Sequence, residues 1–85
     1  MQVLIPSSLR SYTGVSRVEA NGATLGEVLA DLDSRFPGLR FRMVDEQDRL
    51  RPHMRVFVNA QAVHDLARHL QPSDDVSIVQ ALSGG

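Results

Sequence analysis

The segment from Thr24 to Gly38 constrains the fold most, because it combines a helix start, a helix stop and one apolar stripe. Thr24 and Glu27 have the spacing of a capping box, in which the Thr24 hydroxyl accepts from a first-turn amide and Glu27 reaches back to the Thr24 amide. Pro37-Gly38 ends the helix by removing a donor and permitting a left-handed turn. Apolar residues recur at helical intervals on one face: Leu25, Val28, Leu29, Leu32 and Phe36. A single helix with one such stripe must pack on a second layer.

The segments around this helix alternate apolar and polar residues, which predicts strands over 1–5, 16–20, 55–59 and 76–82, the first two forming a hairpin. Residues 11–14 are expected to be a loop, 39–54 to be irregular, and 63–70 to form a short helix or turn. A right-handed crossover through the helix would place the first and last strands parallel at the centre of the sheet.

The predicted fold class is therefore α+β, with the β-grasp (ubiquitin-like) architecture: a mixed four- to five-stranded sheet with one main helix packed on one face. Residues 1–82 are expected to form a single domain, followed by a flexible tail over residues 83–85. In this arrangement the last strand is central, so the tail would project from a rigid platform.

Composition excludes several classes of function. The net charge of −1 argues against binding to nucleic acid or membranes through bulk electrostatics. No apolar run approaches the roughly 18 residues that cross a bilayer, and there is no leader peptide, so a cytoplasmic location is expected. The chain has no cysteine and hence no thiolate nucleophile. It is expected to be monomeric when free.

Neither the histidines nor the acidic residues have the spacing of a metal site. Zinc needs three or four convergent ligands, and His53, His64 and His69 do not form such a set. The acidic group from Asp45 to Asp48 lacks the spacing and the glycine of a calcium loop. Both groups are therefore interpreted as solvated surface, and no metal site is predicted.

The sequence ends in Gly84-Gly85, directly after the last alternating segment. Glycine lacks a Cβ, so such a tail can thread a narrow channel and place its carboxylate beside a nucleotide phosphate in another protein. All nine basic residues are arginine, so an activated tail could not be joined to a side-chain amine of its own chain. The alternative is that the diglycine is an incidental frayed end.

A docking surface is predicted on the sheet face that points away from the helix. Arg55 and Phe57 alternate with the core-facing valines, Val79 lies on the same face of the last strand, and Leu82 precedes the tail. Small apolar clusters ringed by polar residues are typical of transient protein interfaces. Alternatively, Phe57 covers an edge of the sheet, or the 39–54 segment folds over it.

Several short motifs occur together along the whole chain. They are Val3-x-Ile5-Pro6, Thr24-Leu25-x-x-Val28-Leu29, Val56-x-Val58-Asn59, Leu70-x-x-x-Asp74-x-Val76 and the terminal Gly84-Gly85. In this combination the chain resembles the ubiquitin-like sulfur carriers of the MoaD/ThiS family. The opening Ile5-Pro-Ser-Ser-Leu-Arg-Ser-Tyr-Thr-Gly14 is most similar to the carriers that serve cysteine biosynthesis.

The resemblance implies a protein cosubstrate that is not itself an enzyme and binds no cofactor. An ATP-dependent, ubiquitin-activating-type adenylyltransferase would adenylate the Gly85 carboxylate, with Leu82, Ser83 and Gly84 required for activation. A rhodanese- or desulfurase-type donor would then supply sulfur, giving a C-terminal thiocarboxylate. A synthase would accept that sulfur for cysteine or another sulfur-containing metabolite.

Three other interpretations stay open. The chain is also consistent with the small subunit of molybdopterin synthase, which would pair stably with a larger catalytic subunit. A ubiquitin-like modifier joined to lysines of other proteins would begin with the same adenylate. A plain β-grasp interaction module would carry the diglycine by coincidence.

Overall fold

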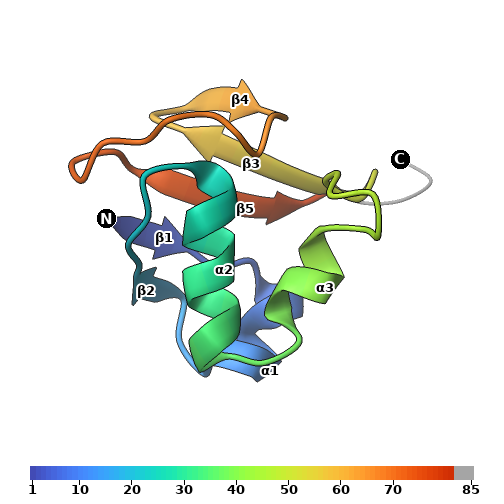
Figure 1. The fold of residues 1–85 in the computed structure, drawn as a ribbon. Coiled ribbons are helices and arrows are strands. Elements are labelled where there is room, and N and C mark those ends of the chain that lie inside the picture. Colours follow the sequence, from blue (N-terminus) through green and yellow to red (C-terminus); the bar gives the residue numbers. More distant parts are fainter. Residues whose placement is uncertain (82–85) are drawn as a thin grey trace.

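One mixed sheet and a layer of helices organise residues 1–81, the part of the chain that the computed structural model describes (Figure 1). The strands are β1 (Gln2–Leu4), β2 (Arg17–Glu19), β3 (Met54–Val58), β4 (Gln61–Val63) and β5 (Val76–Gln80). The helices are η1 (Ser7–Leu9), α1 (Arg10–Thr13), α2 (Leu25–Arg35) and α3 (Leu39–Met43).

The strands follow the order β2-β1-β5-β3-β4, which places the last strand in the middle of the sheet. β1 and β2 form the predicted antiparallel hairpin, and β1 pairs with β5 in parallel. β5 also pairs with β3 in the antiparallel sense, with Val79 opposite Arg55 and Ser77 opposite Phe57. The predicted β-grasp fold is confirmed, with five strands.

The predicted helix is α2, and its start is held as the capping-box spacing indicates, with one difference. The Thr24 hydroxyl accepts from the Glu27 amide at 3.2 Å. The Glu27 carboxylate, however, accepts from the Ala23 amide at 3.1 Å, one residue before the position expected from the sequence. The helix still ends before Pro37-Gly38, with Gly38 at a φ of 95°.

The core lies between α2 and one face of the sheet, and no polar or charged side chain is buried among the described residues. α2 contributes Leu25, Val28, Leu29 and Leu32, which are at most 1% exposed. Alternate residues of the three central strands meet them: Val3, Met54, Val56, Val58, Val76 and Ile78. Alternation along each strand therefore leaves the intervening residues on the opposite face of the sheet.

The expectation of a loop over residues 11–14 is wrong, because the short helix α1 covers Arg10–Thr13, directly after η1. Leu9 is buried and anchors the segment, and Gly14 closes it at a φ of 74°. Helices this short have too little periodicity to be recognised, and they depend on tertiary packing for stability.

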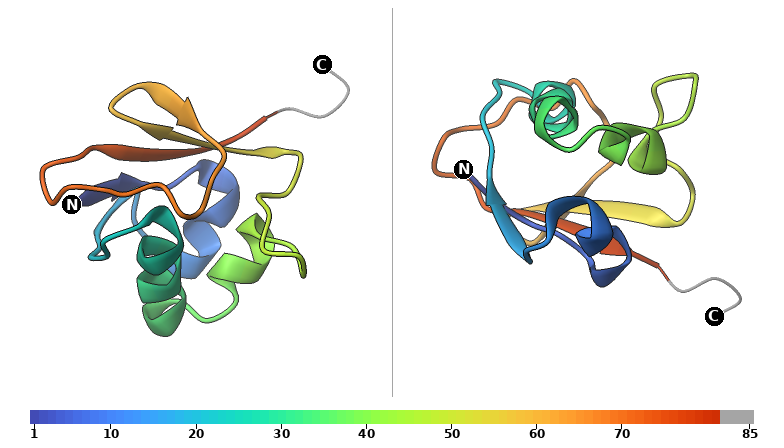
Figure 2. Two further views of the ribbon diagram at one scale, coloured as in Figure 1. Left: turned by 45° about the horizontal axis from the view of Figure 1, so that its top comes forward. Right: turned by 90° about the horizontal axis from the view of Figure 1, so that it is seen from below.

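Residues 39–54 are also more ordered than expected. α3 buries Leu39 and Met43 against the core, and it lies on the same side of the sheet as α2 (Figure 2). Val44 then forms a β-bridge with Leu50, which closes the turn that carries Asp45 and Asp48. Within α3 only Leu39 and Met43 are buried, so its apolar stripe is a single turn long.

Strand β4, which was not predicted, ends at the start of the segment 63–70, for which a short helix or turn was expected. β3 and β4 are joined by the two-residue turn Asn59-Ala60, whose φ values of 50° and 70° are those of a tight hairpin turn. Within residues 63–70 the expected turn is present, around Leu66 and Ala67.

The segment after β4 closes the N-terminal end of α2. The Leu25 amide donates to the Arg68 carbonyl at 3.0 Å, and the Gly26 amide donates to the Leu66 carbonyl at 2.8 Å. These bonds satisfy first-turn donors that would otherwise need water or a ligand. The first amides of α2 are therefore occupied by backbone carbonyls of the same chain and are not available to bind an anion.

Asp74 links the β3–β4 turn to the start of β5. Its carboxylate accepts from the Gln71 amide at 2.8 Å and from the Asn59 side-chain amide at 2.9 Å. These hydrogen bonds, the Gln71 amide first, hold the pKa of Asp74 below its usual value of 3.8. Because the folded state favours the carboxylate, Asp74 stabilises the fold above its usual pKa, and this contribution is lost as the pH falls through the folded-state pKa.

Asp74→Asn is therefore expected to lower the free energy of unfolding at about pH 7 and to flatten the loss of stability below about pH 4. Denaturant unfolding at a series of pH values measures both effects. Asp75→Asn is the control, since it removes the same charge but no side-chain acceptor that bonds within residues 1–81. Identical acid profiles for the wild type and Asp74→Asn would contradict this assignment.

Candidate docking face and tail exit

The sheet face away from α2 carries the three predicted docking residues. Phe57 lies opposite Ser77 of β5 and Ala62 of β4. Ser77 is in turn paired with Leu4 of β1, so these side chains form a row across the sheet. Val79 and Arg55 form the next row towards the end of β5.

Exposure on this face is graded. Phe57 is half-buried, whereas Val79 is 40% exposed and Arg55 is exposed. α3 packs on the opposite side of the sheet, so it does not cover Phe57 (Figure 2). Val79 and part of Phe57 are therefore accessible on this face, and their role in docking stays a prediction.

A groove of about 410 Å³ extends this face along the end of β5. Its apolar walls come from Leu4 and Pro6 on one side and Val79 on the other, with Ser7 and Ser8 at the rim. Arg10 also lines it, and its Nε donates to the Ile5 carbonyl at 3.2 Å, which orients the guanidinium beside the groove.

The sequence-based prediction missed Leu4, Pro6 and Arg10 as parts of this surface. Leu4 was recognisable, since it occupies the outward position of the first alternating strand. Pro6 and Arg10 had no comparable signal, because η1 and α1, which bring them to β5, were not predicted.

The tail exit lies at the end of β5, beside the connection that leads into β3 (Figure 1). The Ala81 amide donates to the His53 carbonyl at 2.8 Å, and Gln80 is paired with Met54. Four predicted site residues, Leu82, Ser83, Gly84 and Gly85, lie outside the described residues. Within the described residues, Val79, Arg55 and Ala81 lie together at one corner of the molecule.

The remaining polar residues do not assemble a catalytic or metal centre. Within residues 1–81, no group of three His, Asp or Glu side chains is placed to hold a metal ion. His53, His64 and His69 are all exposed; His53 lies just before β3, and the other two lie five residues apart in the connection between β4 and β5. Across the same residues, none of the helices has the length and the apolar character that crossing a membrane requires.

Comparison with known proteins identifies relatives that share the sequence and the fold. The ThiS family profile matches residues 3–85. "Sulfur carrier protein CysO" of Mycobacterium tuberculosis is 35% identical, over 98% of this chain and 96% of that protein. "Small archaeal modifier protein 3" of Haloferax volcanii is 33% identical, over 74% of this chain and 71% of that protein.

A solved structure extends this likeness to three dimensions. A chain in the crystal structure of the Amycolatopsis orientalis BexX/CysO complex superposes with a TM-score of 0.91 at 36% identity, covering 99% of this chain and 98% of that chain. This chain belongs to the ThiS family of ubiquitin-like proteins.

Proposed function

We propose that this protein is a sulfur carrier whose Gly85 carboxylate is adenylated and converted to a thiocarboxylate. The observation that carries the proposal is the family match, which extends to residue 85. It is joined by 35% identity, over nearly the full length, to a protein named as a sulfur carrier. The carrier is a cosubstrate, so the chemistry belongs to its partners. It supplies a carboxylate and a surface that those partners recognise.

The carboxylate has to be activated because its oxygen is a poor leaving group. In the first step a Gly85 oxygen attacks the α-phosphorus of ATP, and pyrophosphate leaves. A sulfur nucleophile, hydrosulfide in the simplest case, then attacks the acyl carbon of the adenylate, and AMP leaves. The product is a C-terminal thiocarboxylate, and a persulfide donor gives the same product once a second thiol cleaves the intermediate acyl disulfide.

We assign the docking of the activating enzyme to the face formed by Phe57, Val79 and Arg55 and to the adjoining groove. Val79 is exposed two residues before Ala81, and the groove that it lines runs along the end of β5, so we expect a partner that takes the tail to cover both. Desolvated apolar contacts ringed by polar groups supply most of the affinity in such interfaces. Leu82, Ser83 and Gly84 then lead Gly85 into the partner's nucleotide site.

ATP–pyrophosphate exchange with a ubiquitin-activating-type enzyme from the same organism tests the proposal. We expect exchange that depends on this protein and saturates with its concentration. Exchange at the rate of the enzyme alone, with several such enzymes, would contradict it and favour a plain interaction module. The cytoplasmic location expected from the sequence stays a prediction and belongs to the same proposal.

A second candidate function is supported by the identity to an archaeal modifier protein. A modifier and a sulfur carrier share the adenylate and differ in the nucleophile that receives the acyl group. Recovery of Gly-Gly remnants of this tail on lysines of cellular proteins would favour the modifier. Stable co-purification with a larger synthase subunit would instead favour the small subunit of molybdopterin synthase.

A further inference from the structure

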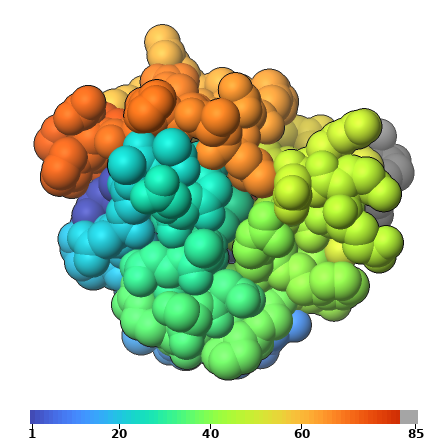
Figure 3. Space-filling view, in the orientation of Figure 1, coloured from blue at the N-terminus to red at the C-terminus, as the bar shows by residue number. Residues whose placement is uncertain are grey.

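The segment that leads into β3 beside the tail exit carries a net positive charge, because its arginines outnumber Asp45, Glu46 and Asp48, although the chain as a whole carries a net charge of −1. Five of the nine arginines fall within residues 40–55: Arg40, Arg42, Arg49, Arg51 and Arg55. The segment that carries them forms one flank of the molecule beside α2, coloured yellow-green in Figure 3. We call Arg42, Arg51, His53 and Arg55 the arginine flank.

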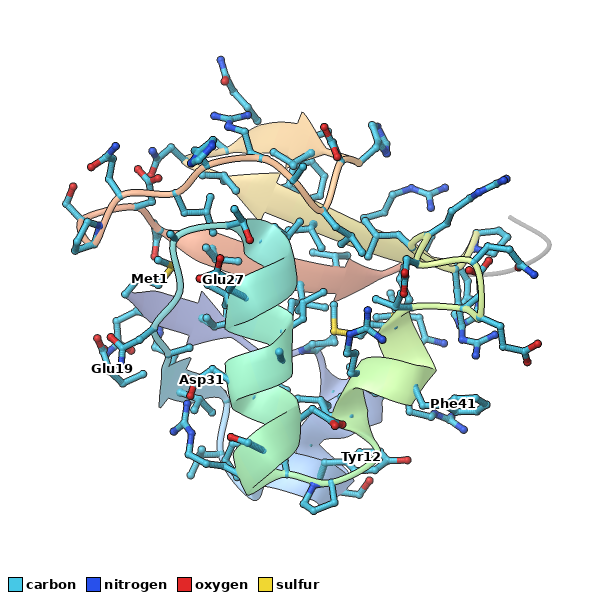
Figure 4. All side chains as sticks on the ribbon, in the orientation of Figure 1. Met1, Tyr12, Glu19, Glu27, Asp31 and Phe41 are labelled. Carbon is cyan, nitrogen blue, oxygen red and sulfur yellow. The ribbon has the colours of Figure 1, made fainter. Side chains whose placement is uncertain are left out.

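Phe41 and Arg51 give this flank a defined geometry. Phe41 is 63% exposed and projects outward from α3 (Figure 4). The Arg51 guanidinium carbon lies 4.7 Å from the centre of the Phe41 ring, and Arg51 Nε donates to the Phe41 carbonyl at 2.7 Å. The stacking and the hydrogen bond together fix the guanidinium plane, and its terminal nitrogens donate no hydrogen bond within residues 1–81.

These two residues line a recess of about 260 Å³ together with Arg42 and His53. Arg42 and Arg51 form no ion pair within the described part of the chain. Asp48 pairs with Arg40 at 3.1 Å, and the Asp45 carboxylate accepts from the Gln47 and Arg49 amides, although its charge also acts on Arg51. The recess is therefore lined by two arginines and a histidine, with the Arg51 guanidinium held in place and no carboxylate in its lining.

The arginine flank is continuous with the tail exit and with the docking face. The His53 carbonyl accepts from the Ala81 amide at 2.8 Å. Arg55 lies opposite Val79, and its guanidinium bonds to the Met54 carbonyl at 3.2 Å. A protein that receives the tail and covers Val79 is thereby brought against Arg51 and His53.

We propose that the arginine flank binds an acidic surface of the activating enzyme at the entrance to its tail-binding channel, with a carboxylate held between Arg51 and Arg42. This inference rests on the proposed function and adds the chemistry of the partner surface. A protein carboxylate fits better than a nucleic-acid backbone, since Asp45, Glu46 and Asp48 lie on the other side of Phe41 and would repel an extended polyanion. Charges at the rim of an interface act mainly on association rate and on salt dependence.

Charge reversal at two positions of the flank tests the inference. In steady-state adenylation assays, Arg42→Glu and Arg51→Glu are each expected to lower kcat/KM for the carrier about tenfold at low salt, with kcat unchanged. The difference from the wild type should shrink between about 20 mM and about 500 mM salt, because salt screens exposed charges. Arg68→Glu is the matched control, as Arg68 is an exposed arginine in the loop that closes the start of α2.

The outcomes separate this inference from the proposed function. Arg42 is exposed, and its side chain makes no hydrogen bond within residues 1–81, so Arg42→Glu reports on charge even where Arg51→Glu disturbs the packing on Phe41. If the wild type is activated and the flank variants behave like Arg68→Glu, the inference is overturned and the proposed function stands. A loss that is equal at both salt concentrations would also overturn it. Failure of the wild type to be adenylated would overturn both.

Discussion

Deletion of Gly84 and Gly85 is expected to abolish adenylation and to leave the fold intact. The proposed reaction takes place at the Gly85 carboxylate, and a tail shortened by two residues would present the Ser83 carboxylate too far from the bound ATP. The sheet and the core are complete within residues 1–81, so thermal unfolding should be unchanged. Pyrophosphate exchange and thermal unfolding of the same sample measure the two parts of this prediction.

A full-length variant separates tail length from tail shape. Gly85→Ala keeps the carboxylate at the same distance and adds only a Cβ, which restricts the backbone and widens the tail. We expect it to be folded and to exchange far more slowly than the wild type. Unchanged exchange by the deletion variant would show that the site of adenylation is elsewhere.

Val79→Asp is expected to give the largest loss among changes on the folded surface. The substitution places a carboxylate at the edge of the apolar groove, where a docked partner would remove it from water, and lets it pair across the strands with Arg55. Losing a central interface contact costs about 2 kcal/mol or more, which is a factor of about 30 in affinity. We expect KM for the carrier to rise by about that factor while kcat stays the same.

Val15→Asp is the matched control for this change. Val15 is also an exposed valine, 52% accessible, but it lies in the turn before β2 and lines no part of the groove. Denaturant unfolding of both variants distinguishes lost docking from lost stability. Equal KM values for Val79→Asp and Val15→Asp would contradict the assignment of this face.

The sequence predicts those parts of the fold that repeat a pattern over several turns or residues. The stripe from Leu25 to Phe36 and the alternation around Val56 and Val76 each contain several independent signals that agree. These signals were sufficient to predict α2, the central strands and the parallel pairing of β1 with β5. The outward positions of Phe57 and Val79 follow from the same alternation.

The missed elements are short or have unusual turn chemistry. α3 buries only Leu39 and Met43 on one turn, which no periodicity can reveal. β4 follows Asn59-Ala60, where both residues have positive φ but the glycine that usually marks such a turn is absent. α3 depends on packing against the core, whereas β4 is an edge strand that pairs with β3 across this turn.

The candidate site follows the same division: its strand residues were predictable from the sequence, and the residues placed by short helices were not. The face with Phe57 and Val79 depends on strand alternation, whereas the groove needs η1 and α1 to approach β5. The arginine flank needs α3 and the 44–50 turn to place Phe41 under Arg51, which are ten residues apart. Tertiary structure therefore supplies the charged half of the proposed interface.

The most direct test of the central claim is the intact mass of this protein after incubation with ATP, a sulfide source and an activating enzyme from the same organism. The account predicts a gain equal to one oxygen replaced by one sulfur, which requires ATP and is absent from the variant that lacks Gly85. Adenylation without any gain of sulfur, with the acyl group recovered on lysines of other proteins, would contradict the carrier function and establish a modifier.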